Sequence, residues 1–285
     1  MKLGLALSGG GVRGIAHAGV LRALEENNIK VDMIAGTSCG SLVASLYAMG
    51  YSPYYIYILF KKYAKEIAGI NMVTFATGLN SILLNKKLKI SGLNTGESIE
   101  KIYDELASKK GIKTMADIKM PIAIPTVDIS ESNEYIFTNK IPERVKNKRF
   151  YIDNITIGKA VRASSSFPVI FSPCEFGNHK FLDGGTLDNI PTIPVKKLGA
   201  EKVISINFDA DTIDEESNVM DIVMKSLDIM GNKISEKDLQ NSDLILTVPS
   251  DKTGLLDIEK IDKCYNLGYD AAMKNMEKIL EVVKE

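Results

Sequence analysis

The sequence predicts an α/β protein with a mostly parallel central sheet. Near the N-terminus, short apolar runs are each followed by a glycine-rich turn and then by a helical pattern of apolar residues. The same alternation of strand and helix returns between residues 202 and 284. Strands and helices that alternate at this spacing form right-handed βαβ units, which build a parallel sheet.

The expected strands are short apolar runs, and the expected helices carry apolar residues at helical spacing. The strands cover residues 2–7, 31–35, 121–127, 134–137, 202–207 and 244–248. The helices cover residues 12–26, 41–49, a segment starting at 53, and 97–107, 156–165, 219–234 and 258–284. Gly50 is a C-cap signal for the second helix, and Ser52-Pro53 is an N-cap followed by a first-turn proline for the third.

We expect a single domain. The 285 residues contain no internal repeat and no low-complexity linker that would divide them. Residues 51–120 are less regular and rich in glycine, so we expect this segment to form a cap or a substrate-binding region.

Composition and charge are those of an ordinary globular protein with a sizeable core. Hydrophobic residues make up 45%, charged residues 25%, and the formal net charge is −1. This charge gives no general attraction to nucleic acid, so we expect no nucleic-acid partner. The longest apolar runs fall well short of the roughly 18 residues that cross a bilayer, and residues 3–7 are too short a run for a secretory signal.

The cysteines indicate a reducing compartment. Cys39, Cys174 and Cys264 are odd in number, scattered, and form no C-x-x-C pair. Neither a disulfide framework nor a zinc site is indicated. We therefore expect a cytoplasmic protein.

Residues 36–40 have the G-x-S-x-G form of a nucleophile elbow, a tight strand-to-helix turn that exposes a serine hydroxyl. Ser38 falls where an apolar strand is expected to end and a helix to begin. The motif is short, and the plain alternative is that Ser38 caps the following helix.

Residues 9–14 can bind an anion through backbone N–H groups, and they also satisfy the G-x-G-x-x-G fingerprint of dinucleotide-binding proteins. That fingerprint requires an acidic residue at the end of the second strand. Here Asp32 stands at the start of the second strand, and Gly36-Thr37-Ser38 occupies its end. The sequence therefore favours an oxyanion site over a nucleotide site.

A serine nucleophile needs a base, and the chain has two histidines, His17 and His179. The order Ser, acid, His of α/β-hydrolases would place the acid of a triad before His179, because no histidine follows it. Asp183 is a simpler candidate, since it ends a short apolar run directly before two glycines. Its plain alternative is an ordinary Asp-Gly turn.

Four blocks together resemble the patatin-like phospholipase family, in the order that the family has them. The glycine loop with its flanks, residues 5–21, resembles the first motif, and residues 36–41 resemble the G-x-S-x-G elbow. Residues 160–168 resemble a further block, and residues 183–185 resemble the D-G-A/G motif. Residues 186–285 carry no motif and add only a compatible α/β pattern.

The resemblance implies a three-layer α/β/α fold and a lipid acyl hydrolase, of phospholipase A or lysophospholipase type, that needs no metal or cofactor. Ser38 would attack the ester, and Asp183 would accept its proton. The backbone N–H groups of Gly9, Gly10 and Gly11 would bind the oxyanion. Arg13 would add positive charge near the oxyanion or a lipid phosphate, unless it is an ordinary solvated or salt-bridged arginine. The resemblance gives His17 no catalytic role.

The substrate expected is a phospholipid or a related lipid, which raises the question of access. Residues 51–60 are rich in tyrosine and precede Lys61-Lys62, a combination that suits peripheral contact with a membrane but equally a core or a groove wall. A non-catalytic lipid-binding or regulatory protein with the same fold is the alternative function.

Overall fold

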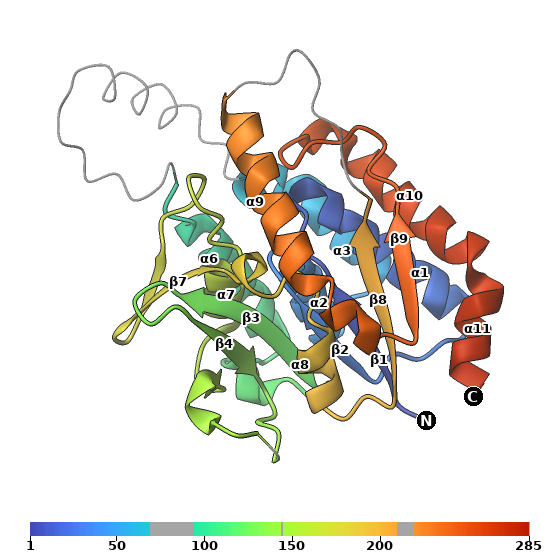
Figure 1. The fold of residues 1–285 in the computed structure, drawn as a ribbon, viewed down its shortest axis with the longest axis horizontal. Helices are drawn as coiled ribbons and strands as arrows, with labels where there is room; N and C mark the ends of the chain where they lie inside the picture. The colour runs from blue at the N-terminus through green and yellow to red at the C-terminus, as the bar shows by residue number, and fades with distance from the viewer. Residues whose placement is uncertain (69–93, 144, 210–218, 285) are drawn as a thin grey trace.

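The computed structural model describes residues 1–68, 94–143, 145–209 and 219–284, and all statements below refer to these residues (Figure 1). A single mixed sheet runs through the molecule in the order β5-β4-β3-β2-β1-β8-β9, with β7 added beside β3 and β6 beside β7. The strands are β1 (Leu3–Leu7), β2 (Met33–Gly36), β3 (Ile122–Asp128), β4 (Asn133–Thr138), β5 (Tyr151–Ile152), β6 (Cys174–Phe176), β7 (His179–Asp183), β8 (Lys202–Phe208) and β9 (Leu244–Val248).

The centre of the sheet is parallel, as predicted. β1 pairs in parallel with β2 on one side and with β8 on the other, and β9 continues the parallel order beyond β8. Every residue of β1 is buried, because helices cover both faces of the sheet at this point.

The antiparallel part of the sheet determines where the site forms. β2 pairs with the first residues of β3, at Ile122 and Ala123, and then ends at Gly36. Further along the same edge of β3, β7 takes its place in antiparallel orientation, with Asp183 opposite Thr126. Because β7 runs back toward the end of β2, its last residue arrives beside the turn that follows Gly36.

Two apolar clusters, one on each face of the sheet, give the three layers that the resemblance implies. Leu5 and Leu7 of β1 pack into the larger cluster, which contains α1 (Ala16–Glu26), α2 (Cys39–Ala48) and α10 (Ile261–Lys274). Ala6, which points the other way, packs into a smaller cluster with Val195 of α8 (Thr192–Lys197). Figure 1 shows α1 and α10 behind the sheet and α9 (Val219–Ser235) in front of it.

Two of the predicted helices differ from the structure. The helix expected over 12–26 begins with a 3-10 turn, Gly11–Ile15, before α1. The helix expected over 258–284 starts as a 3-10 turn and then divides into α10 and α11 (Met276–Lys284). At the division, the amide of Asn275 donates a hydrogen bond to the Ala271 carbonyl, a side-chain bond that competes with continued helix. The sequence prediction missed α8, β5 and β6, which are too short to show a period.

The described part of residues 51–120 forms α3 (Pro53–Lys62), α4 (Ala64–Ile67) and α6 (Glu97–Lys109), and residues 69–93 of the expected cap lie outside the described residues. Ser52 caps α3 as predicted, since its hydroxyl accepts the Tyr55 N–H. Ile56 and Phe60 are buried, whereas Tyr54 and Tyr55 are exposed, so the aromatic stretch contributes both to the core and to the surface. Among the described helices, none combines the length and apolar composition that crossing a bilayer requires.

Candidate active site

Ser38 occupies a strained turn between β2 and α2, as the elbow prediction requires. Its backbone has φ 52° and ψ −125°, a conformation that residues other than glycine rarely adopt. The two glycines of the motif allow the close approach: a Cβ on Gly36 would lie 2.3 Å from the Gly40 carbonyl oxygen, and a Cβ on Gly40 would lie 2.4 Å from the Leu7 carbonyl oxygen. The turn therefore holds the half-buried Ser38 side chain at the end of the parallel strands.

Asp183 is a buried carboxyl that lines the same cleft as this serine. Its side chain is 2% exposed, and Oδ1 accepts the Gly185 N–H at 2.8 Å. Oδ2 has no hydrogen-bond partner among the described residues. Burial raises the pKa of Asp183 to about 7, and the nearby Ser38 hydroxyl and the Gly185 N–H offset part of that effect. A carboxyl of this kind is suited to accepting a proton near neutral pH.

The C-terminal end of α7 (Ile157–Ser164) and the residues that follow it hydrogen-bond to the backbone of both Ser38 and Asp183. Ser164 Oγ accepts the backbone N–H of Ser38 at 3.1 Å, and the Ser166 carbonyl accepts the backbone N–H of Asp183, also at 3.1 Å. Arg162, which is buried, donates to the Ser172 carbonyl at 2.7 Å and to the Ser166 hydroxyl. A single segment thus fixes the backbone of Ser38 and of Asp183 relative to each other.

The glycine loop lies directly beside Ser38. A Cβ on Gly9 would lie 3.2 Å from the Cβ of Ser38 and 2.5 Å from Oδ1 of Asn189. The Gly9 N–H already donates to the Asn189 carbonyl at 3.1 Å. The N–H groups of Gly10 and Gly11 have no acceptor within the described chain. Of the three predicted oxyanion donors, Gly10 and Gly11 are therefore available, and Gly9 is engaged.

Arg13 and His17 donate hydrogen bonds to backbone carbonyls of this loop. Arg13 is only 3% exposed, which excludes the solvated arginine considered above, and its Nε donates to the Gly10 carbonyl at 3.2 Å. Burial lowers the pKa of His17 to about 4, so the imidazole is neutral at pH 7, and Nε2 donates to the Ser8 carbonyl at 2.9 Å. Both side chains position backbone carbonyls of the loop.

His179 lies at the opposite end of β7 from Asp183. Its Nδ1 is 2.5 Å from Oδ2 of Asp128, a buried carboxyl on β3 that also accepts the N–H groups of Ser130 and Glu131. This histidine is not among the residues that line the cleft beside Ser38. The geometry therefore favours Asp183 over a triad that uses His179.

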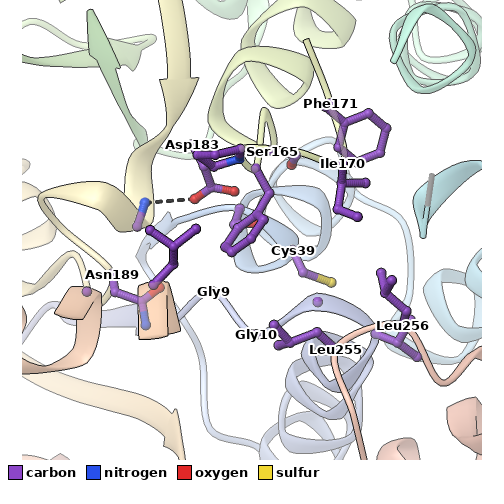
Figure 2. Close-up of a pocket in the computed structure, with 18 of the residues that line it drawn as sticks. Gly9, Gly10, Cys39, Ser165, Ile170, Phe171, Asp183, Asn189, Leu255 and Leu256 are labelled. Atoms are coloured by element: carbon purple, nitrogen blue, oxygen red, sulfur yellow. Dashed lines mark hydrogen bonds between the residues drawn. The ribbon is translucent and has the colours of Figure 1, made fainter. Parts of the chain in front are cut away.

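A cleft of about 950 Å³, counted out to open solvent, lies over Ser38 and Asp183. Figure 2 shows Asp183 and Ser165 on one side of it, Gly9 and Gly10 on the other, and Cys39 between them. The walls are mostly apolar and come from separate segments, namely Ile67, Ala68, Phe167, Pro168, Ile170, Phe171, Leu227, Met230, Leu255 and Leu256. Only Ile67 and Ala68 belong to the described part of residues 51–120, so much of the wall comes from segments in which no binding role was predicted.

A model of the family described as patatin-like phospholipase matches residues 5–196 of the chain. The chain belongs to the patatin-like phospholipase family. This membership confirms the resemblance seen in the four motif blocks.

Relatives within the family include the protein named lysophospholipase NTE1 of Scheffersomyces stipitis, which is 30% identical over 95% of this chain. The protein of the same name from Candida albicans is 28% identical over 93% of the chain. The chain spans under a fifth of the length of these patatin-like relatives, 18% and 19% respectively. The crystal structure of VipD from Legionella pneumophila matches with a TM-score of 0.54 at 15% identity, over 97% of this chain and 66% of VipD, which shows a shared fold.

Several residues of this patatin-like site carry no role in the sequence prediction. Ser164 and Ser166 belong to a block that resembles the family, so the motif marked the segment without indicating which atoms it holds. Asn189 had no signal in the sequence. It donates from its side-chain amide to Asn232 of α9 and accepts the Gly9 N–H through its carbonyl, contacts that join residues far apart in the chain.

Proposed function

We propose that the protein hydrolyses acyl esters of phospholipids, lysophospholipids or a related lipid, with Ser38 as nucleophile and Asp183 as base. The observation that carries this proposal is the unpartnered Oδ2 of Asp183, buried in the same cleft as the strained Ser38. A buried acceptor without a partner is unfavourable in itself, and it is explained if it accepts the serine proton during the reaction.

In the proposed reaction, the Ser38 hydroxyl passes its proton to Asp183 as its oxygen attacks the ester carbonyl. The negative charge that develops on the carbonyl oxygen is stabilised by the N–H groups of Gly10 and Gly11. When the tetrahedral intermediate collapses, the proton on Asp183 goes to the leaving alcohol, and an acyl-serine remains. Water, activated by the same carboxylate, then hydrolyses the acyl-serine and restores Ser38.

The shape of the cleft supports a lipid substrate. Its walls are mostly apolar, and the few polar groups cluster around Ser38, Asp183 and Asn189. An acyl chain would lie against the apolar side chains and place its ester at this polar end. The name lysophospholipase of the two yeast relatives supports lysophospholipids as one substrate class to test.

Ser38→Ala and Asp183→Asn variants test the assignment. Each should lower kcat/KM for lysophospholipid and for short-chain aryl esters by about 10²–10⁴. Ser38 of the parent should also be labelled by a fluorophosphonate. Full activity in both variants would refute the dyad, and an unlabelled, inactive parent that still binds lipid would favour the non-catalytic lipid-binding protein.

We further propose that the mouth of the cleft contacts a membrane surface. Met230 of α9 lines the cleft and is 58% exposed, and Ile229 beside it is 55% exposed. Val169, between the lining residues Pro168 and Ile170, is 38% exposed. Ile229→Glu should reduce hydrolysis of phosphatidylcholine vesicles but not of a soluble aryl ester, because only the vesicle must dock. Ile245→Glu, at an exposed position on β9, is the matched control. Equal activity of the two variants on vesicles would contradict membrane contact through α9.

A cytoplasmic location is also part of the proposal. The three cysteines are free thiols and are buried, a state that a reducing compartment maintains. Fractionation of cells expressing the tagged chain tests this, with the protein expected in the cytosolic fraction and at the inner membrane surface. Recovery in a secreted or oxidised form would contradict it.

A further inference from the structure

Ser165 presents a second unpartnered polar atom to the cleft. Its side chain is 7% exposed, and Oγ has no hydrogen-bond partner. Of the buried side-chain polar atoms without a partner in the described chain, those on residues that line the cleft are Ser165 Oγ and Asp183 Oδ2. Buried hydroxyls are normally satisfied. The proton of Ser38 accounts for Asp183 Oδ2, so the unpartnered Ser165 Oγ indicates a ligand group that is absent from the free cleft.

The residues on either side of Ser165 hydrogen-bond to the backbone of the nucleophile and of the base. Its neighbour on one side, Ser164, accepts the Ser38 N–H, and its neighbour on the other side, Ser166, accepts the Asp183 N–H. Ser165 therefore stands between the two contacts that fix the nucleophile and the base. Figure 2 shows Ser165 on the Asp183 side of the cleft, away from the glycine loop.

These positions assign different substrate oxygens to different walls. The carbonyl oxygen belongs at the N–H groups of Gly10 and Gly11, on the glycine-loop side. The alcohol oxygen must lie near Asp183, because that carboxyl returns the proton to it. Ser165 faces the same side as Asp183, so its hydroxyl is placed for the alcohol oxygen of the ester rather than for the carbonyl oxygen.

We propose that the Ser165 hydroxyl donates a hydrogen bond to the leaving-group oxygen of the ester and so assists departure of the lipid alcohol. The inference rests on the proposed function. As the intermediate collapses, the bond between carbon and the alcohol oxygen breaks and its electron pair moves to that oxygen. The proton comes from Asp183, while Ser165 keeps its own proton and stabilises the developing charge.

Esters that share an acyl chain but differ in the alcohol test this directly. An alkyl alcohol is a poor leaving group that needs the hydrogen bond, whereas 4-nitrophenol leaves readily without it. For Ser165→Ala, kcat/KM for a lauroyl glyceryl ester should fall about 10- to 100-fold, and kcat/KM for 4-nitrophenyl laurate should stay within about threefold of the parent. Ser165→Thr, which keeps the hydroxyl, should restore the alkyl ester activity.

The ratio of the two kcat/KM values is the decisive readout. Fluorophosphonate labelling of Ser38, in which the leaving group needs no such assistance, should proceed in Ser165→Ala at the parent rate and so report an intact site. If Ser165→Ala does not fold, Ser165→Cys, a weak donor of similar size, takes its place in the same comparison. An equal loss for both esters, or no loss for either, would overturn the role of Ser165. Failure of the proposed function would look different, since Ser38→Ala would then retain hydrolysis.

Discussion

The hydroxyl of Ser164 accepts the backbone N–H of Ser38 at 3.1 Å, and this bond joins the end of α7 to the nucleophile turn. The turn is strained at Ser38, with a positive φ, so contacts from outside the turn are needed to maintain it. The bond crosses from residue 164 to residue 38 and cannot be replaced by a neighbour in the chain.

Ser164→Ala should therefore slow hydrolysis of all esters by about tenfold, because the Ser38 N–H loses its acceptor and the turn loosens. Ser45→Ala is the matched control, since Ser45 is a buried hydroxyl of α2 that bonds only within its own helix, to the Leu42 carbonyl. Both variants should lose a similar free energy of unfolding, about 1 kcal/mol. Steady-state kinetics and urea unfolding measure the two effects, and equal activity of the two variants would contradict a role for the Ser164 bond.

Asp183 should give the enzyme a rising pH profile. Burial raises its pKa to about 7, and only the ionised carboxyl can accept the Ser38 proton. In the parent, kcat/KM should therefore increase with pH and level off above about pH 7. Asp183→Asn should reduce kcat/KM by about 10²–10⁴ and remove this dependence. A parent profile that is flat between about pH 5 and about pH 8 would be inconsistent with Asp183 as the base.

The same residue should make the fold less stable as pH rises. The folded pKa lies above the unfolded value of 3.8, so the folded state holds a proton that the unfolded chain releases. The stability that this adds is full below pH 3.8 and is lost as pH rises through about 7, at about 1.4 kcal/mol per unit. Asp183→Asn lacks this loss. The free energy of unfolding of the variant, measured in urea, should therefore rise relative to that of the parent between about pH 5 and about pH 8. A difference that does not change with pH would show that the carboxyl is not protonated in the fold.

Arg13→Met should lower kcat/KM about tenfold for charged and neutral lipids alike, because Arg13 holds the Gly10 carbonyl and so orients the oxyanion donors. Arg22→Met, which removes an exposed arginine paired with Glu26 on α1, serves as the control and should leave activity unchanged. The comparison of a phospholipid with a neutral glyceride is informative. A loss confined to the phospholipid would instead support Arg13 as a phosphate contact.

His179→Ala should leave kcat/KM within about twofold of the parent, since His179 lies at the far end of β7 and pairs with Asp128. The expected cost is stability, about 1 kcal/mol, because the buried Asp128 loses one of its partners. Thermal unfolding and ester hydrolysis on the same preparation test both statements. Loss of activity in a folded variant would instead support a catalytic triad that uses His179 as the base.

The sequence alone predicts much of the fold, and it proposes Ser38 and Asp183 as the reacting pair, because local signals mark both. The strand over 244–248 has the predicted bounds, and the glycines around Ser38 are read directly from a short motif. The placement of Asp183 was not predictable in the same way. It depends on β7 taking the edge of β3 that β2 leaves, a pairing between residues 126 and 183 that no local pattern encodes.

The same reason explains why the sequence could not show which N–H groups of the glycine loop already have an acceptor. A glycine loop shows where free N–H groups can occur, but it does not show that the Gly9 N–H is engaged by the Asn189 carbonyl. That contact joins residues 9 and 189, and it becomes visible only when β1 and the segment after β7 are placed side by side. Long-range contacts of this kind decide which predicted donor remains available.

Much of the cleft wall comes from chain segments that hold neither Ser38 nor Asp183. Ile67, Leu227 and Leu255 approach from helices and loops outside the elbow and outside β7. Exchange of these segments can therefore change which acyl chain is accepted without moving the chemical centre. A single scaffold of this kind can diversify toward many lipids through its walls alone, and grafted wall segments offer a route to new substrate preferences.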